Sequence, residues 1–438
     1  MGAQFFVRSF SGKCLTTVLG ILYSAADGDM EEEKDKHARP QLPANTMGCT
    51  GCGLCESVCV RHAIRMEYSV EGFMRPVVDV SRCTGCGACE KMCARVESCG
   101  RPHNDAKCVE ATSSMAGERR QSASGGVCSA LARCIVERGG VVFGVAHSQL
   151  SFPAYTRCET IEELAQIRGS AYMQADPARC YERVRKELSM GKMVMLVGLP
   201  CQIRAARTLF GWGKQNLLLV DLACFGVPSR NLWLSYKRDL EQNGKSVVSV
   251  NFRDKRQGWR QYCITARFHD GAEISGGGNM LNPFSRMFNT RYCLNETCYK
   301  CVHNMEARWG DITAGDYWGH KDLPGDGSAD GIGSCIINTP QGERVWEMAQ
   351  GHLSSKPISK EDAAAWNPGM HKGAEKIPTE RKKVLQQLAD MPLSSVSRRY
   401  LYPTGHKKPA CSILGCRITL PEFIFNWCYH AYKQLKRH

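Results

Sequence analysis

The sequence predicts a multidomain protein, in which a small N-terminal α+β module precedes an α/β body with a mostly parallel sheet. A cysteine run at 49–59 recurs 34 residues later at 83–93, which indicates a duplicated module. From about Arg119 onward, continuous apolar stretches alternate with helical stretches, the pattern of buried parallel strands covered on both faces. At 438 residues the chain is too long for the duplicated module alone, so two or three domains are expected.

Both cysteine runs have the spacing Cys-x2-Cys-x2-Cys-x3-Cys and share the letters C-T-G-C-G-x-C-E. Four thiolates at this spacing hold a [4Fe–4S] cluster, and in two-cluster ferredoxins the fourth Cys of each run ligates the other cluster. One cluster is therefore assigned to Cys49, Cys52, Cys55 and Cys93, and the other to Cys83, Cys86, Cys89 and Cys59. The usual Pro after the last Cys is replaced by Val60 and Ala94, which removes no ligand. A zinc site or a disulfide framework is the alternative. The sequence predicts a bacterial dicluster ferredoxin-like domain.

The composition limits which cellular compartments and which classes of binding partner are expected. The 25 cysteines, together with clusters, favour a reducing compartment, so a cytoplasmic location is expected. The net charge of +14 could serve nucleic acid, a membrane surface, an anionic cofactor or an acidic protein. Basic residues are spread along the chain and concentrate only near the C-terminus, so no nucleic-acid partner is expected. The aromatic and basic tail at 420–438 could dock on a membrane, but a packed terminal helix is the expectation.

Residues 1–26 contain no Asp or Glu and include an apolar stretch too short to span a bilayer. An organellar address is one interpretation, and a domain that begins near Met30 is the other.

The body alternates helices and strands in chain order. A helix follows Ser122–Gly126 and runs to Val136, and further helices are expected at 180–190 and 202–210. Strands are expected at 141–145, 193–197 and 217–222, with others in 251–270 and 311–319. In such sheets ligands bind beyond the carboxyl ends of the strands, where the turns 198–201 and 223–229 fall. Ser124, Gly125 and Gly126 offer backbone N–H groups for a phosphate at a helix start, with a simple packing turn as the alternative.

A third group of cysteines, Cys293-x4-Cys298-x2-Cys301, has spacing like that of plant-type ferredoxins. Three ligands predict a third cluster, whose fourth ligand must come from elsewhere in the chain.

Residues 124–319 resemble the beta subunits of coenzyme F420-reducing hydrogenases and the related F420H2 dehydrogenase, formate dehydrogenase and hydroxymethyl-chlorophyll reductase proteins. The matching pieces, in order, are S-G-G at 124–126, R-G-S-A-Y-M-Q at 168–174, G-L-P-C-Q at 198–202, C-F-G-V-P-S at 224–229, F-R-D-K at 252–255 with G-W at 258–259, C-Y-K-C at 298–301, D-I-T at 311–313 and G-D-Y-W-G at 315–319. With the ferredoxin module, the resemblance covers roughly residues 47–395.

The resemblance implies a non-covalent FAD in the α/β body. The flavin contacts it implies are Ser124, Gly125, Gly126, Arg168, Ser170, Gly198, Pro200 and Gln202. It also implies a different third-cluster ligand set, Cys201, Cys224, Cys298 and Cys301, with Cys293 in reserve. The chain departs from many relatives at Ala171, where Lys is common, and at Phe225, where His is common. The resemblance therefore implies the cofactor fold and the electron path more firmly than the identity of the substrate.

The expected function is an iron–sulfur flavoprotein oxidoreductase that moves electrons between a two-electron carrier, such as F420, and FAD and [4Fe–4S] clusters. Its partners would be a redox protein or ferredoxin and a small-molecule carrier. The alternatives are a ferredoxin-dependent reductase of an organic, sugar-linked substrate and a non-catalytic electron-transfer subunit. The expected divisions are an extension and linker (1–38), the ferredoxin domain (39–100), regions like the N-terminal (119–230) and C-terminal (231–395) parts of the beta subunits, and a basic tail (396–438).

Overall fold

A computed structural model gives the fold of most of the chain. It describes residues 40, 42, 48–94, 106–146, 153–276, 281–303, 308–321, 328–365, 367–370, 376–401, 410–413 and 416–419. The expectations for residues 1–38 and for the tail at 420–438 lie outside these residues. Among the described residues, no helix is both long and apolar enough to cross a bilayer.

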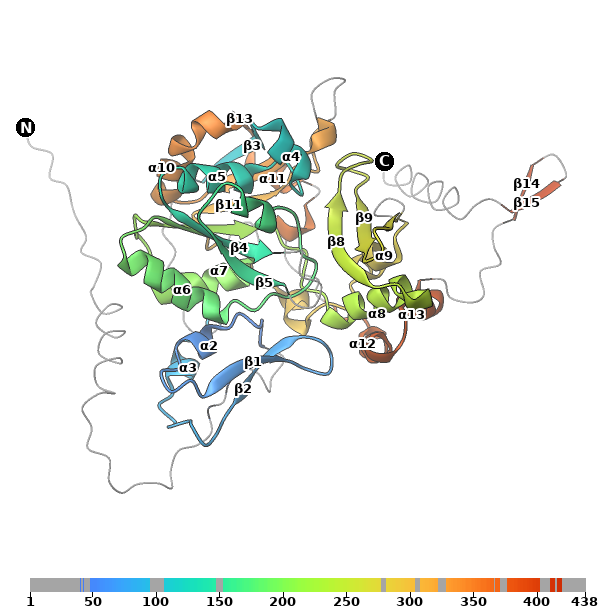
Figure 1. Cartoon of the computed structure of the whole chain (residues 1–438), viewed down its shortest axis with the longest axis horizontal. Helices are drawn as coiled ribbons and strands as arrows, with labels where there is room; N and C mark the ends of the chain where they lie inside the picture. Colours follow the sequence, from blue (N-terminus) through green and yellow to red (C-terminus); the bar gives the residue numbers. More distant parts are fainter. Residues whose placement is uncertain are drawn as a thin grey trace, which may run out of the picture.

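The duplicated module folds as two copies of one turn with a hairpin between them. Its elements are α2 (Leu54–Ser57), β1 (Ile64–Tyr68), β2 (Met74–Val78) and α3 (Ala88–Lys91). β1 and β2 pair antiparallel, with Ile64 opposite Val78. Each short helix follows a left-handed glycine, Gly53 or Gly87, which a side chain would strain. Figure 1 shows this module in blue below the body, where α2 contacts α6 and α7.

The body is built on one large mixed sheet. Its strands are β3 (Lys107–Ser113), β4 (Val141–Ala146), β5 (Ala154–Cys158), β6 (Val194–Gly198), β7 (Leu217–Leu222), β11 (Ile312–Asp316), β12 (Gly333–Ile337) and β13 (Leu353–Pro357), in the order β13-β3-β12-β11-β7-β6-β4-β5. The central strands β11, β7, β6 and β4 are parallel, as the sequence predicts. The flanking pairs are antiparallel, which the sequence analysis did not anticipate.

Helices cover both faces of this sheet. The helices are α4 (Ala116–Gln121), α5 (Val127–Val136), α6 (Ala178–Ser189), α7 (Pro200–Phe210), α10 (Pro340–Met348) and α11 (Lys360–Ala364). α5 and α10 pack on one face, where Val142, Met195 and Leu218 point. α6 and α7 pack on the other, where the neighbouring residues Val141, Val194 and Leu217 point. Each central strand is therefore apolar on both sides, which explains its continuous apolar sequence.

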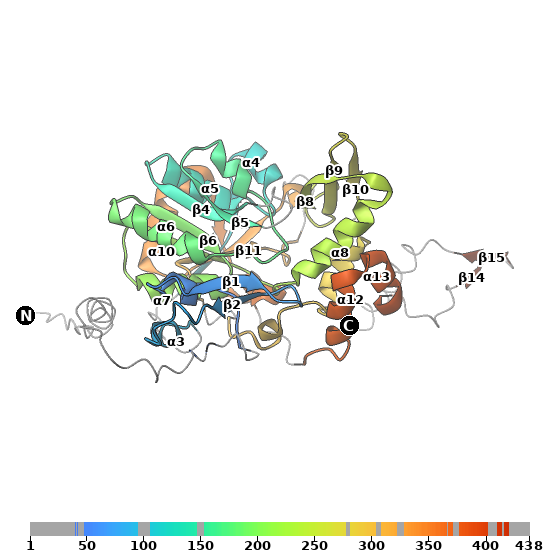
Figure 2. The same cartoon turned by 60° about the horizontal axis from the view of Figure 1, so that its bottom comes forward.

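A second unit stands beside the large sheet in both views (Figures 1 and 2). It contains α8 (Arg230–Leu240), β8 (Val247–Asp254), β9 (Cys263–Phe268), β10 (Glu273–Ser275), α9 (Pro283–Asn289), α12 (Arg381–Asp390) and α13 (Leu393–Tyr400), with its own aromatic core. Residues 231–395, which the sequence predicts to form one region, are thus divided between the second unit and the large sheet, because β11 to β13 return to that sheet. A hairpin of β14 (Ala410–Ile413) and β15 (Cys416–Thr419) follows.

Candidate iron–sulfur centres and cofactor edge

The first cysteine run lies beside Cys93 from the second run. Burial raises the pKa of the Cys52 thiol to about 11, and the nearby thiols of Cys49 and Cys93 add to that rise. Burial also raises the pKa of Cys55, and Cys93 again adds to it. The Gly51 N–H points at the Cys49 Sγ, 3.4 Å away. This is the arrangement that the crossed assignment of the fourth Cys requires.

The second run faces a small cavity with Cys59 from the first run. This cavity, of about 20 Å³, is lined by Cys59, Cys83, Cys86 and Cys89. The Ala63 N–H lies 3.3 Å from the Cys59 Sγ, and Cys86 is exposed. Because Cys89 also acts on the pKa of Cys55, the two ferredoxin sites are neighbours.

A larger cavity, of about 140 Å³, lies between the module, the large sheet and the second unit. Four cysteines line it, namely Cys201, Cys224, Cys298 and Cys301. Cys201 is the second residue of α7, Cys224 follows β7, and Cys298 lies in a short 3-10 helix at Glu296–Lys300. Three segments distant in sequence therefore meet at one site.

Burial dominates the chemistry of these thiols. It raises the pKa of Cys224 to about 12, and the thiols of Cys298 and Cys301 add to that rise. The pKa of Cys201 is also raised well above its ordinary value, again chiefly by burial and then by Cys224. The Val227 N–H approaches the Cys298 Sγ at 3.4 Å. These thiols lie close together, and their raised pKa values keep them protonated when nothing is bound. A metal ionises its thiol ligands, so the arrangement is suited to metal binding.

Cys293, which spacing alone favoured, does not line this cavity. It is fully buried in the aromatic core of the second unit, beside Met287. The structure instead brings together the four cysteines that the family resemblance implied.

The cavity joins the body to the first ferredoxin site. Thr50 and Ala94, the neighbours of two ferredoxin ligands, line it as well. The Tyr181 hydroxyl lies 3.0 Å from the carbonyl oxygens of both Cys52 and Gln202, which links the module to the body. The first-run site therefore lies between the large cavity in the body and the second-run site.

Basic and aromatic side chains complete the lining of the large cavity. Arg204, Arg291, Lys300 and His303 contribute to it together with Phe225. Arg291 adopts a left-handed backbone, φ 63°, and its guanidinium stacks 4.3 Å from the Phe225 ring. Phe225 thus gives this wall an apolar surface that a cation covers.

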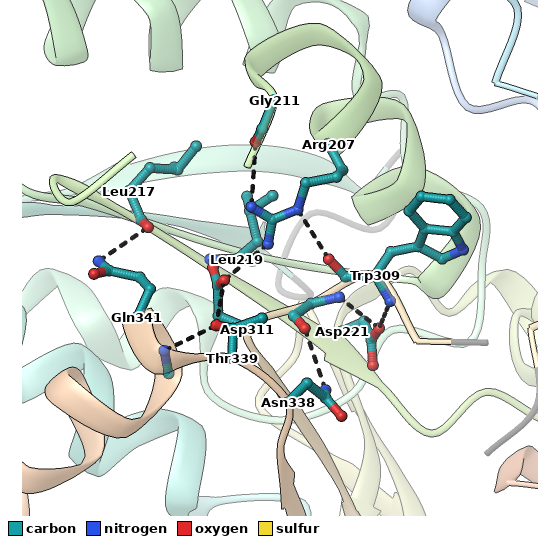
Figure 3. A network of polar contacts seen from close by, with 12 residues as sticks. Arg207, Gly211, Leu217, Leu219, Asp221, Trp309, Asp311, Asn338, Thr339 and Gln341 are labelled. Atoms are coloured by element: carbon teal, nitrogen blue, oxygen red, sulfur yellow. Dashed lines mark hydrogen bonds and ion pairs between the residues drawn. The ribbon is translucent and has the colours of Figure 1, made fainter. Parts of the chain in front are cut away.

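A buried polar network holds the segments that carry these cysteines (Figure 3). On α7, Arg207 donates to Asp311 at 2.9 Å and to the Trp309 carbonyl at 3.1 Å. Asp221, near the end of β7, accepts from the N–H groups of Trp309 and Gly310. α7, β7 and the start of β11 are therefore fixed relative to one another.

The predicted flavin contacts lie in different surroundings, unlike the four cysteines that line one cavity. Gln202 is buried, and its amide bonds to the Leu199 N–H, the Tyr155 hydroxyl and the Ala175 carbonyl. Gln202 therefore supports the turn from Gly198 to Pro200, which is the first residue of α7. The Tyr155 hydroxyl leaves no room for a Cβ on Gly198 in this turn.

The turn before α5 is close-packed. A Cβ on Gly125 would lie 2.5 Å from the Gly333 nitrogen, and Ser124 donates to the Ile332 carbonyl. Gly126 has φ +83° and caps α5. Packing, the alternative weighed above, thus accounts for these glycines, and a phosphate at this helix start stays a prediction.

Two guanidinium groups lie near that turn. Arg168 donates to Gln121, and Arg253 forms a two-pronged ion pair with Asp316 at the end of β11. The Nε atoms of both arginines are buried without a hydrogen-bond partner among the described residues. Ser170 is half-buried in the segment that follows Arg168. Arginine side chains suit phosphate groups, but Asp316 already occupies the Arg253 fork, so Arg168 is the donor at this edge that fits an anionic dinucleotide.

The four cysteines at each site match the number of ligands that a cubane cluster takes. Within the described residues, no group of His, Cys, Asp or Glu could hold one metal ion. In a cubane each thiolate binds a different iron atom, so the four ligands surround a larger object.

Sequence reasoning missed the supports of these sites. Asp221 stands alone among apolar residues in β7, and Arg253 is a buried charge near the end of the mixed strand β8. A charge inside a buried strand needs a partner, so both could have been flagged, but the sequence does not name the partners.

Comparisons with known proteins match two parts of this chain to family models. Residues 48–95 match the family model of the 4Fe-4S dicluster domain, and residues 191–361 match that of the C terminus of the coenzyme F420 hydrogenase/dehydrogenase beta subunit. The F protein of the F(420)H(2) dehydrogenase of Methanosarcina mazei is 22% identical over 374 residues, which is 82% of this chain and 94% of that protein. A chain in the xenon-derivatised F420-reducing [NiFe] hydrogenase complex of Methanosarcina barkeri is 19% identical, with 67% of this chain and 90% of that chain covered at a TM-score of 0.42.

The dicluster module on a mixed α/β body defines an iron–sulfur oxidoreductase with two [4Fe–4S] clusters in its N-terminal module. Residues 191–361 carry the C-terminal domain of coenzyme F420 hydrogenase/dehydrogenase beta subunits, and the comparisons support this family.

Proposed function

We propose that this protein passes electrons between a two-electron carrier, F420 or a similar molecule, and one-electron iron–sulfur centres. FAD and a third [4Fe–4S] cluster would lie in the α/β body. The observation that carries the proposal is the shared cavity, because Thr50 and Ala94 of the ferredoxin module line it together with the four body cysteines.

The third cluster would be held by Cys201, Cys224, Cys298 and Cys301. The Val227 N–H stabilises the Cys298 thiolate, and the Phe225 ring limits the access of water on one wall. The network of Arg207, Asp221 and Asp311 fixes the segments before any cofactor binds.

FAD would be held at the carboxyl edge of the parallel strands. Arg168 would supply a donor for its phosphates, and the turn at Ser124–Gly126 would supply backbone N–H groups. A bound flavin would exchange electrons in pairs and the clusters would exchange them singly, which makes the chain a converter between two-electron and one-electron carriers. Hydride transfer needs no side-chain acid or base, and none is assigned.

The partners of this reaction would be a ferredoxin or another redox protein at the exposed second-run site and a small carrier at the flavin. Cys86 is the exposed ligand of that outer site, which suits an exit or entry point for electrons. A cytoplasmic location goes with this assignment.

The test is an anaerobic visible spectrum of purified, cluster-reconstituted protein, with extracted flavin quantified. Reduced F420, NADPH, NADH and reduced ferredoxin are then titrated in turn. We expect about one flavin per chain, bleached by one of these donors, with the cluster absorbance following. A matched Cys224→Ser variant should bleach its flavin but fail to reduce the ferredoxin clusters. Clusters without any flavin that can be reconstituted would contradict the proposal and leave an electron-transfer role alone.

A further inference from the structure

Arg308 is an incompletely compensated cation in the interior of the body. Its side chain is 0% exposed, yet among the described residues its Nε and Nη1 atoms have no hydrogen-bond acceptor. Nη2 donates to the Gly369 carbonyl at 2.6 Å and lies 3.1 Å from the Met370 sulfur. Buried charged groups normally use all their donors, so the position needs an explanation.

Asp221 is the counter-charge of Arg308, and it is held at a distance. Its Oδ1 lies 3.6 Å from the Arg308 Nη1, too far for a hydrogen bond, and has no other hydrogen-bond partner in the described part of the chain. Its Oδ2 accepts from the backbone N–H groups of Trp309 and Gly310, at 3.1 and 3.0 Å. Figure 3 shows Asp221 fixed in this way between β7 and the start of β11. The carboxylate therefore orients the guanidinium as a buried ion pair without a hydrogen bond between the two groups.

The guanidinium lies behind Cys224, one wall of the large cavity. The Gly369 backbone that accepts from Arg308 packs directly on Cys224, because a Cβ on Gly369 would lie 2.5 Å from the Cys224 nitrogen. The field of this cation therefore reaches a ligand of the third site.

We propose that the buried Arg308 guanidinium, oriented by Asp221, sets the reduction potential of the cluster at the third site. The inference rests on the proposed third cluster. An added electron makes a cluster more negative, so a fixed positive charge in a low-dielectric interior stabilises the reduced form and raises the potential. Among the described residues, the contacts of Arg308 are with Gly369, Met370 and Asp221, so it is a positioning residue that acts through its charge.

The cations in the lining of the cavity are less suited to this role. Arg204 and Arg291 are partly exposed and Lys300 is exposed, so water and salt screen their charges. Arg308 has no such screening, because its side chain is fully buried.

The experiment is an anaerobic redox titration of the reconstituted full chain, followed by electron paramagnetic resonance. Arg308→Gln should lower the midpoint of the third cluster, and Asp221→Asn should raise it, because the variants remove charges of opposite sign. Arg308→Lys should stay near the wild-type midpoint. Arg133→Gln, in α5, removes an arginine paired with Glu118 and should change no midpoint. The ferredoxin clusters should keep their midpoints in all four variants.

An unchanged third-cluster midpoint in both Arg308→Gln and Asp221→Asn would overturn the inference and leave the proposed function intact. If Arg308→Gln does not fold, Asp221→Asn decides alone: a raised midpoint supports the inference and an unchanged one overturns it. Wild-type protein with only the two ferredoxin clusters would remove the third site from the proposed function, and this inference with it.

Discussion

The two kinds of cysteine site in this molecule are built in opposite ways. In the ferredoxin module, each run supplies three ligands within seven residues, and the left-handed glycines between them shape the turn. The third site draws Cys201, Cys224 and the pair Cys298 and Cys301 from three separate segments. The difference shows that cysteines can be brought together by local chain geometry or by the packing of the whole body.

Energetic support differs in the same way. The ferredoxin cysteines receive N–H groups from nearby backbone, as at Gly51 and Ala63. The third site depends on a buried network that joins α7, β7 and β11. Mutations outside the ligands should therefore damage the third site more than the ferredoxin sites.

The largest expected effect is the loss of one cluster through a ligand from the other run. Cys93→Ser should abolish the first-run cluster and cut the path between the body and the outer site, because Cys93 lies beside Cys52 and Cys55. Cys59→Ser should instead abolish the outer cluster. Electron paramagnetic resonance of the reduced variants separates the two cases. Loss of the second-run cluster in Cys93→Ser would show that the ligands do not cross.

The next effect concerns the buried pair of Arg207 and Asp311, whose side chains are 3% and 2% exposed. Arg207→Met leaves a buried carboxylate without its cation and should cost about 3–5 kcal/mol of unfolding free energy. Urea unfolding, followed by tryptophan fluorescence, measures this, and Asp311→Asn in the same chain should restore part of it. Iron analysis should show the third cluster lost before the ferredoxin clusters, and equal loss from all sites would break the contrast.

A smaller effect compares two glycines of the repeat. Gly51 and Gly87 have φ values of +71° and +70°, so alanine at either costs about 1–2 kcal/mol of stability through the left-handed backbone. A Cβ at Gly51 would also lie 2.2 Å from the Gln174 Nε2, whereas Gly87 has open space around it. Gly51→Ala should therefore lower the melting temperature more than Gly87→Ala. Equal shifts would mean that Gln174 does not anchor the module on the body.

Tyr181→Phe tests the link between the module and α6. The variant removes a hydroxyl that reaches the Cys52 and Gln202 carbonyls, and it should cost about 1 kcal/mol in unfolding free energy. All clusters should remain, because no ligand is lost. Loss of the first-run cluster in this variant would show that the module depends on the body.

The smallest effect is a pH dependence at the other end of α6. Hydrogen bonds from Arg157 and Lys192 lower the pKa of Glu187 below its ordinary value of 4.5. The pair therefore stabilises the fold above pH 4.5 and loses that contribution as the pH falls toward the lowered pKa. Glu187→Gln should lower the free energy of unfolding at about pH 7 by about 1 kcal/mol or less. The difference from wild type should be smaller at about pH 4. A gap that widens in acid would contradict this sign.

The local motifs of the sequence predicted the module and the central strands, because ligand spacing and apolar runs are short-range signals. They did not predict β3, β12 and β13, which join the sheet antiparallel from distant parts of the chain. Spacing alone pointed to Cys293, which belongs to the second unit's core, and only the family resemblance named Cys201 and Cys224. Residues such as Arg308 escape sequence reasoning because their role depends on a partner far away in the chain.

The central claim is that one chain holds a third cluster between its body and its ferredoxin module. The most direct test is the iron and acid-labile sulfide content of anaerobically reconstituted wild type and Cys224→Ser, each normalised to protein. The account predicts about twelve iron atoms per chain in wild type and about eight in the variant, four for each cubane. About eight in both proteins would contradict it.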